Sequence, residues 1–94
     1  MYKQALEKGG LAVVTGGASG VGKVAARRFA EAGLGVVIAD LPGEALEQAA
    51  EEIKAVAGDR TVLAVPTDVS DFDSVSALAD AAFDAGEVAV LMNN

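Results

Sequence analysis

The spacing of the apolar residues predicts an α/β protein, a doubly wound parallel sheet with the element order β-α-β-α-β-α-β. Short apolar runs recur along the chain, and segments with helical periodicity fill the intervals between them. The runs are continuous rather than alternating, as expected for strands buried on both faces of a parallel sheet. Strands joined by crossover helices are parallel, and such crossovers are right-handed. Half of a (β/α)₈ barrel shows the same alternation and is the structural alternative, although the phosphate loops of such barrels usually come late in the chain.

Four apolar runs give the predicted strands, and their first residues lie 24, 26 and 27 positions apart. The strands are expected at Leu11–Thr15, Gly35–Ala39, Thr61–Val65 and Val88–Met92. This period is typical of βα units rather than of a solenoid repeat. The chain has 94 residues with no linker and no low-complexity segment, so we expect one domain over residues 1–94.

The first predicted helix follows a glycine-rich segment and ends near Gly33, a residue type suited to the C-terminal end of a helix. Its apolar residues share one face, formed by Val21, Val24, Ala25, Phe29 and Ala32. Its charged residues Lys23, Arg27 and Glu31 share another face, which we expect to point outward.

The second and third helices are predicted from the same periodicity. The second runs from about Glu44 to Ala57 and places five apolar residues inward: Leu46, Ala49, Ala50, Ile53 and Val56. The third begins after Ser70, the expected N-cap, with Asp73 as its capping-box partner. Its expected inward residues are Val75, Leu78, Ala79, Ala82 and Phe83.

Composition narrows the possible functions. The formal net charge of −7 argues against nucleic acid or an anionic membrane as a partner, because either one needs a basic surface. The chain has no Cys, and so no thiol chemistry, and no His, the commonest general base and metal ligand. No apolar stretch approaches the roughly 20 residues of a membrane span. Residues 1–10 are too polar for a signal peptide, so we expect a cytoplasmic protein.

The segment Thr15–Gly22 predicts a phosphate-binding turn between the first strand and the first helix. Its glycines Gly16, Gly20 and Gly22 permit tight backbone geometry and place no Cβ in the way of a ligand. The helix N-terminus then presents free N–H groups and the positive end of its dipole to an anion. Taken alone, Gly20 and Gly22 fit equally well as turn and packing residues.

Polar residues follow the other three predicted strands. Asp40 ends the second strand, 18 positions after Gly22, where a carboxylate accepts hydrogen bonds from an adenosine ribose. Asp68 follows the third strand, and Asn93 and Asn94 follow the fourth. Each also has a simpler explanation as a turn or cap residue. Since open α/β sheets bind ligands at the carboxyl ends of their strands, the shared placement favours a nucleotide site.

These motifs resemble the N-terminal part of the short-chain dehydrogenase/reductase family. Thr15–Gly22 fits the family's Thr-Gly-x-x-x-Gly-x-Gly turn, Asp68-Val69 fits its adenine-contacting Asp-Val, and Asn93-Asn94 fits the first half of its Asn-Asn-Ala-Gly motif. The likeness covers essentially the whole chain, and the motif spacing agrees throughout. It implies a Rossmann-like sheet with the strand order 3-2-1-4, incomplete within these 94 residues.

The resemblance also implies which residues bind a nicotinamide dinucleotide. They are Gly16, Ser19, Gly20, Val21, Gly22, Asp40, Leu41, Asp68, Val69 and Asn94. Members of the glycine-rich turn would line the path of the pyrophosphate and adenosine. Asp40, Leu41 and Asn94 would meet the adenosine ribose, and the pair after the third strand would hold the adenine. Thr15 is expected to be structural, tying the turn to the neighbouring strand.

Asp40 predicts a preference for NAD over NADP, because a 2′-phosphate would bring negative charge beside its carboxylate. No Lys or Arg stands at Ala18 or Leu41 to offset that repulsion. Lys23 and Arg27 are basic, but we expect them on the outer face of the first helix.

The family's catalytic residues have no counterpart in this sequence. Members carry a Ser, a Tyr-x-x-x-Lys pair and usually a further Asn downstream of the Asn-Asn motif, whereas the one tyrosine here is Tyr2, with Leu6 in the place of the lysine. We therefore expect an inactive fragment of an oxidoreductase whose intact relative transfers a hydride between nicotinamide and an alcohol or carbonyl substrate. The alternatives are a stand-alone nucleotide-binding or interaction module, and a fragment that regains activity with a complementing chain.

An incomplete sheet also predicts self-association. With the order 3-2-1-4, the first two helices cover one face, and only the third helix covers the other. Val88–Met92 becomes an apolar edge strand without Lys or Pro. An uncovered apolar patch of more than about a few hundred Å² usually finds a partner. We expect dimerisation through this face or edge, or else a loosely packed state.

Overall fold

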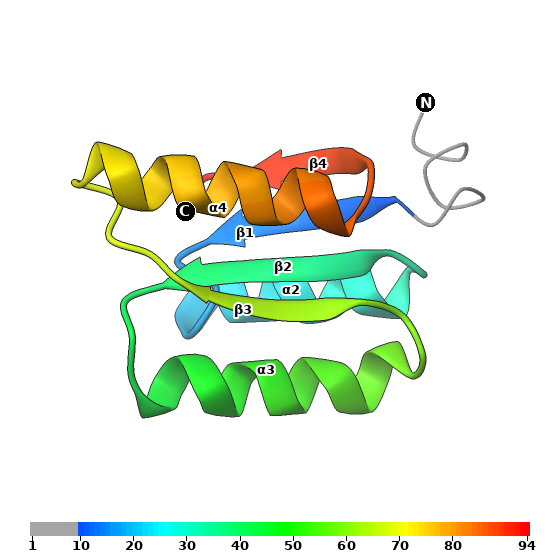
Figure 1. The fold of residues 1–94 in the computed structure, drawn as a ribbon. Helices are drawn as coiled ribbons and strands as arrows, with labels where there is room; N and C mark the ends of the chain where they lie inside the picture. The colour runs from blue at the N-terminus through cyan, green and yellow to red at the C-terminus, as the bar shows by residue number, and fades with distance from the viewer. Residues whose placement is uncertain (1–9) are drawn as a thin grey trace.

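A computed structural model describes residues 10–94, and these form one four-stranded parallel sheet with helices on both sides (Figure 1). The strands are β1 (Leu11–Thr15), β2 (Gly35–Asp40), β3 (Val62–Pro66) and β4 (Val88–Met92). Their order across the sheet is β3-β2-β1-β4, and every neighbouring pair is parallel. The predicted order is confirmed. A half barrel is excluded, because β1 lies between β2 and β4 rather than at one end of a sequential series.

The predicted strand bounds hold to within one residue. β2 extends to Asp40, and β3 lies one residue later than expected at both ends. The shift has a visible cause, since the ladder between β2 and β3 pairs Asp40 with Pro66, and the Thr61 carbonyl accepts a hydrogen bond from the Val36 N–H just before β3 begins. Tyr2 and Leu6, the pair compared with the family's Tyr-x-x-x-Lys, lie outside the described residues.

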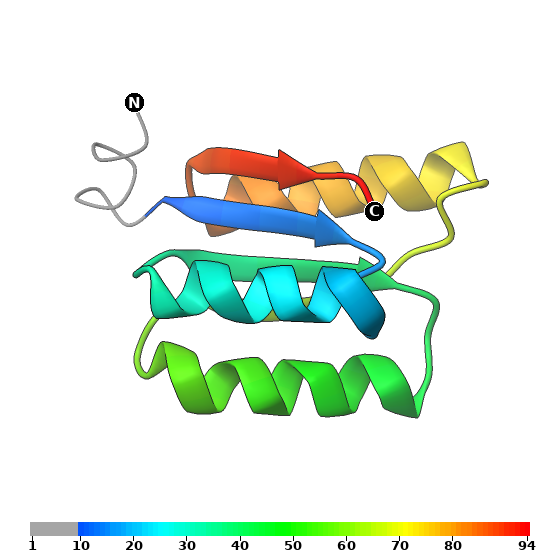
Figure 2. The ribbon, with the colours of Figure 1, turned by 180° about the vertical axis from the view of Figure 1, so that it is seen from behind.

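The helices divide unequally between the two faces of the sheet (Figures 1 and 2). Helices α2 (Gly20–Glu31) and α3 (Glu44–Ala57) cover one face, and α4 (Phe72–Ala85) alone lies on the other. We call the side that presents Val14, Val36 and Ile38 to α2 and α3 the closed face. The side that presents Val13 and Val37 to α4 is the open face. No helix among residues 10–94 is long and apolar enough to cross a membrane.

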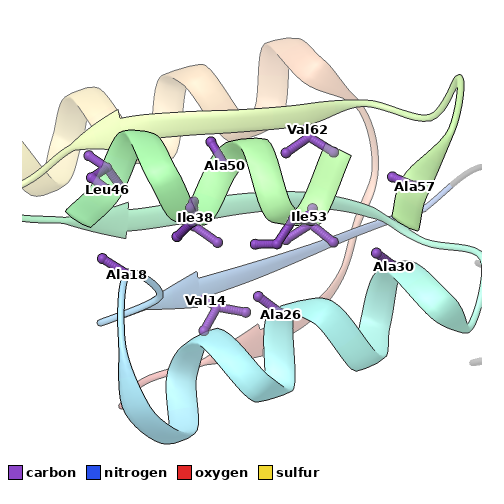
Figure 3. Close-up of a cluster of buried hydrophobic side chains, with 12 residues drawn as sticks. Val14, Ala18, Ala26, Ala30, Ile38, Leu46, Ala50, Ile53, Ala57 and Val62 are labelled. Atoms are coloured by element: carbon purple, nitrogen blue, oxygen red, sulfur yellow. The ribbon is translucent and has the colours of Figure 1, made fainter. Parts of the chain in front are cut away.

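The closed face holds the larger core, seen in Figure 3. Ile38 and Ile53 belong to its middle part and have no exposed surface, and Leu46 lies at one end. Helix α3 buries the face predicted for it, with Val56 half-buried at its margin. Its glutamates lie on the exposed side. Burial of large aliphatic side chains is worth about 1.5–3 kcal/mol each, so this face contributes most of the apolar stabilisation.

Helix α2 buries a different face from the one predicted. Its buried residues are Gly22, Ala26 and Ala30, whereas Val21 and Val24 are 69% and 57% exposed. The three small residues are spaced four apart and let the helix backbone approach the sheet closely. A Cβ at Gly22 would overlap the carbonyl oxygen of Gly16. Close approach, rather than the hydrophobicity of individual side chains, therefore decides which side of α2 faces inward.

Helix α4 also departs from its predicted pattern. Its N-cap is Asp71, whose carboxylate accepts a hydrogen bond from the Asp73 N–H, and not Ser70. Only Leu78 and Ala82 are buried. The other residues expected to point inward, Val75, Ala79 and Phe83, are exposed and border a cavity of about 290 Å³ on the open face. One helix does not fill the area over β1 and β4, so part of its apolar side has no packing partner within residues 10–94.

Candidate functional site

The carboxyl ends of all four strands lie at one edge of the sheet, beside the first turn of α2 (Figure 2). At this edge the chain turns from β1 into α2 through Gly16–Ser19. Gly16 and Gly20 adopt positive φ angles of 66° and 57°, which side-chain-bearing residues rarely adopt. A Cβ at Gly20 would meet nothing within 4 Å, so the backbone angle, not crowding, calls for glycine there.

Two further glycines of the turn are required by packing. A Cβ at Gly17 would lie 2.8 Å from Cβ of Ile38, and one at Gly22 would overlap the Gly16 carbonyl. The turn therefore packs closely against β2 at Gly17, and the start of α2 packs closely against Gly16 at Gly22. The predicted glycine cluster therefore combines residues with special backbone angles and residues in close contact, and the outer side of the turn stays open at Gly20.

The first turn of α2 has no negative charge of its own, and no side chain caps its free N–H groups. Ser19 is the N-cap in an extended conformation, without a side-chain capping bond, and the first turn has no acidic residue. The other two helices differ: α3 has Glu44 and Glu47 in its first turn, and α4 has Asp71 as its N-cap and Asp73 in its first turn. Acidic groups normally offset the positive end of the helix dipole, and α2 alone among the described helices has no acidic residue of its own at that end. An anion fits this position.

Asp40 lies at the end of β2, directly against the glycine-rich turn. Its Oδ2 accepts a hydrogen bond from the Ala18 N–H at 3.1 Å, and its Oδ1 accepts one from the Leu41 N–H at 2.8 Å. The side chain is half-buried, so the carboxylate still has an exposed side. Each carboxylate oxygen has two lone pairs, which leaves acceptor capacity for ligand hydroxyl groups.

The end of β4 is tied to the turn from the other side. The Thr15 hydroxyl lies 3.4 Å from the Met92 carbonyl oxygen and 3.3 Å from Oδ1 of Asn93, and it accepts a hydrogen bond from the Asn94 N–H at 3.1 Å. The Asn94 side-chain amide donates to the Gly16 carbonyl at 3.4 Å. Thr15 is structural, as expected. Asn94 is exposed at the same edge as Asp40, and its amide already holds the turn.

The loop after β3 is built around Asp68. Its Oδ1 accepts hydrogen bonds from the Ser70 hydroxyl at 2.6 Å and the Ser70 N–H at 2.9 Å. These bonds favour the ionised carboxylate and lower the pKa of Asp68. Val69, next in the chain, is 68% exposed. The loop is joined to the site by the Thr67 N–H, which donates to the Asp40 carbonyl at 2.7 Å.

Two residues of this edge were missed in the sequence. The Ala18 N–H is the partner of Asp40, and Thr67 is almost fully buried, with its hydroxyl donating to the Val65 carbonyl. A polar residue directly after an apolar strand is a usable signal for Thr67. Nothing in the sequence marks Ala18, because its contribution comes from the backbone.

Together these features define a Rossmann-like fold. The strand order reverses at β1, between β2 and β4, and the glycine-rich turn opens α2 at that point. Open α/β sheets bind nucleotides in the crevice at such a switch point. The described residues include no cluster of acidic side chains that could hold a metal ion.

Residues 10–94 match the short chain dehydrogenase family, and the chain belongs to that family. It is 49% identical over 84 residues to 1-deoxy-11-beta-hydroxypentalenate dehydrogenase of Streptomyces arenae. The matched residues make up 88% of this chain and 29% of that relative. It is 42% identical over 87 residues to 3beta-hydroxysteroid dehydrogenase 2 of Eggerthella lenta, covering 92% of this chain and 33% of the relative. The chain thus spans about a third of the length of these relatives.

Solved structures agree with the fold. A short chain dehydrogenase/reductase from Burkholderia phymatum in complex with NAD superimposes with a TM-score of 0.81 at 40% identity, over 89% of this chain and 30% of the other. L-sorbose reductase from Gluconobacter frateurii, complexed with NADPH and L-sorbose, superimposes with a TM-score of 0.84 at 33% identity, over 93% of this chain and 33% of the other. Proteins of this fold have therefore been solved in complex with NAD and in complex with NADPH.

Proposed function

We propose that this chain binds the adenosine half of a nicotinamide dinucleotide, as the cofactor-binding part of an oxidoreductase. The observation that carries the proposal is the N-terminus of α2, which has no acidic residue in its first turn and lies between the open side of Gly20 and the carboxylate of Asp40. Such a helix end attracts a pyrophosphate, and an adjacent carboxylate accepts hydrogen bonds from ribose hydroxyls.

Each part of the edge takes one portion of the cofactor. Gly16, Ser19 and Val21 line the path of the pyrophosphate and adenosine, while Gly20 and Gly22 shape the turn. Asp40, Leu41 and Asn94 meet the adenosine ribose. Asp68 and Val69 lie against the adenine. The exposure of Leu41, Val69 and Val21 supports these assignments, because each leaves an apolar surface open at this edge.

The bound cofactor supplies the hydride chemistry, between its nicotinamide and an alcohol or carbonyl carbon of the substrate. The residues of this chain bind and orient the adenosine side. The 94 residues contain no Tyr-x-x-x-Lys sequence, and general acid–base catalysis is typically worth about 10²–10⁴-fold in rate. The chain assayed alone is therefore inactive with a panel of simple alcohols, and steady NADH formation by protein free of host enzymes would contradict this.

The preferred cofactor is NAD rather than NADP. A 2′-phosphate about 4 Å from the Asp40 carboxylate is opposed by on the order of 4 kcal/mol at an effective dielectric near 20, an upper guide for a partly wet site. The nearest basic residue of α2, Lys23, pairs its Nζ with Oε2 of Glu52 at 3.0 Å, which supports an orientation away from the ribose.

Calorimetric titration with NADH and NADPH tests this proposal. We expect NADH to bind more than about tenfold tighter, a difference of about 1.4 kcal/mol. Asp80→Asn is the control, because it removes one negative charge from an exposed position on α4, and it should leave the ratio of the two affinities unchanged. Equal affinities for the two dinucleotides would refute the preference, and binding of neither would refute the cofactor role.

A second proposal concerns the open face, where the chain associates with a second copy or with a complementing chain. Exposed apolar side chains from α4 and β4 gather here: Phe72, Val75, Phe83 and Leu91. Val75, Phe83 and Leu91 border the cavity over Val13. Within residues 10–94, β4 is an edge strand with unpaired N–H and C=O groups. A monomer mass by light scattering at high concentration, with a sharp cooperative melt, would exclude this association.

A further inference from the structure

We propose that Asp40 has a second role, in which its carboxylate fastens the phosphate-binding turn to β2. This inference rests on the proposed function, in which the turn binds a pyrophosphate. It goes beyond ribose recognition, because the bond in question joins Asp40 to the protein's own backbone. The same side chain would then select the cofactor and organise the turn that binds the part common to both cofactors.

The contacts of the turn support this role. Only two hydrogen bonds join it to β2, one from the Gly17 N–H to the Ala39 carbonyl at 3.2 Å and one from the Ala18 N–H to Oδ2 of Asp40 at 3.1 Å. Ala18 is 8% exposed with Asp40 in place, and the bond between them is partly buried. Loss of the carboxylate leaves the Ala18 N–H without its protein partner, which costs free energy.

The other carboxylate oxygen fixes the orientation of Asp40 itself. Oδ1 accepts a hydrogen bond from the Leu41 N–H at 2.8 Å, so each carboxylate oxygen has its own backbone donor. An Asn side chain has one acceptor oxygen and one NH₂ donor. It can therefore satisfy one of these two donors and must turn its NH₂ group toward the other, whereas Ala satisfies neither.

This arrangement predicts a specific failure of cofactor engineering. Replacement of Asp40 removes the repulsion of a 2′-phosphate and also releases Ala18 and the turn. The loosened turn then binds the pyrophosphate of both dinucleotides less tightly. For NADPH this loss offsets part of the affinity gained by removing the repulsion, so the gain in NADPH affinity is smaller than the loss in NADH affinity.

Amide hydrogen exchange and a probe without ribose hydroxyl groups test the inference with Asp40→Ala and Asp40→Asn. In the Asp40→Ala chain we expect the amides of Ala18 and Leu41 to exchange at least about tenfold faster than in the unaltered chain. In the Asp40→Asn chain one of the two amides keeps its protection. Amides in the middle of β2, such as Val37, monitor global opening, and Asp80→Asn is the charge-matched control.

The binding arm uses 2′,3′-dideoxyadenosine diphosphate, which has the pyrophosphate but neither ribose hydroxyl. We expect Asp40→Ala to weaken its binding about tenfold and Asp80→Asn to leave it unchanged. Unaltered exchange at Ala18, or equal or tighter binding of this probe to Asp40→Ala, would overturn the inference. If the unaltered chain binds neither NADH nor adenosine diphosphate, the proposed function fails, and the exchange of Ala18 still decides whether Asp40 holds the turn.

Discussion

The two faces of the sheet are built from the same alternating elements yet are closed to different degrees. On the closed face, two helices cover the sheet, and Val36, Ile38 and Ile53 have no exposed surface. On the open face, α4 covers β1 only in part, and Phe83 remains 70% exposed. The difference teaches that apolar strands alone do not make a core. A core requires enough helices to span the width of the sheet.

The edge that holds the candidate site depends mainly on the closed face. Helix α2 packs through Gly22, Ala26 and Ala30, and this close approach positions its N-terminus beside Asp40. Helix α4 contributes its own N-terminus to the loop after β3, where Ser74 accepts a hydrogen bond from the Asp68 N–H. We therefore expect changes on the closed face to alter both stability and cofactor binding, and changes on the open face to alter mainly association.

The largest effect is expected from truncating the closed core. Ile38→Ala removes a fully buried side chain between α2 and α3 and should lower the free energy of unfolding by about 2–5 kcal/mol. Leu91→Ala is the matched change on the open face, where the side chain is 62% exposed, and should cost much less. Urea unfolding followed by circular dichroism measures both. Equal losses would show that the two faces are equally well packed.

A smaller loss is expected at the contact between α2 and the turn. Gly22→Ala places a methyl group on the Gly16 carbonyl and should cost about 1–3 kcal/mol, with loss of NADH binding. Gly20→Ala meets no atom within 4 Å, but its φ of 57° is strained for Ala, at about 1–2 kcal/mol. Thermal melts and calorimetry compare the two. A Gly22→Ala chain that binds NADH normally would contradict the close-packing explanation.

On the open face, Phe83→Ser should reduce association while leaving stability within about 0.5 kcal/mol, because the ring is mostly exposed. Sedimentation velocity over a range of concentrations detects the change. The comparison variant Val21→Ser alters an equally exposed apolar residue near the cofactor edge and should leave association unaltered. Loss of association with Val21→Ser, but not with Phe83→Ser, would contradict the proposal that the chain associates through its open face.

The smallest effect concerns the pH response of the loop after β3. Hydrogen bonds from Ser70 lower the pKa of Asp68, so Ser70→Ala should raise that pKa. A lowered folded-state pKa stabilises the fold at neutral pH, and this stabilisation is lost as the pH falls from the ordinary carboxyl pKa toward the lowered one. NMR titration of the Asp68 carboxyl carbon measures the shift. Asp80 provides an exposed carboxyl on α4 as a reference, and an unaltered Asp68 titration in Ser70→Ala would contradict the assignment.

Local patterns alone specify much of this protein. Continuous apolar runs locate the four strands to within a residue, and the period of α3 identifies its buried side, because both signals are carried by neighbouring residues. The glycine-rich turn, Asp40 and the family resemblance likewise place the candidate site at the carboxyl edge of the sheet. The resemblance, rather than the spacing, supplied the strand order that the structure confirms.

Tertiary contacts decided the rest. The inward side of α2 depends on how closely its backbone approaches β1 and β2, so Gly22 and Ala26 are buried in place of Val21 and Val24. The exposure of Phe83 depends on how many helices share the open face. The bond between Asp40 and the Ala18 N–H joins positions 22 residues apart, and a backbone donor has no signature in the side-chain sequence. Periodicity records the local conformation of a segment, whereas these features depend on which other segment lies next to it.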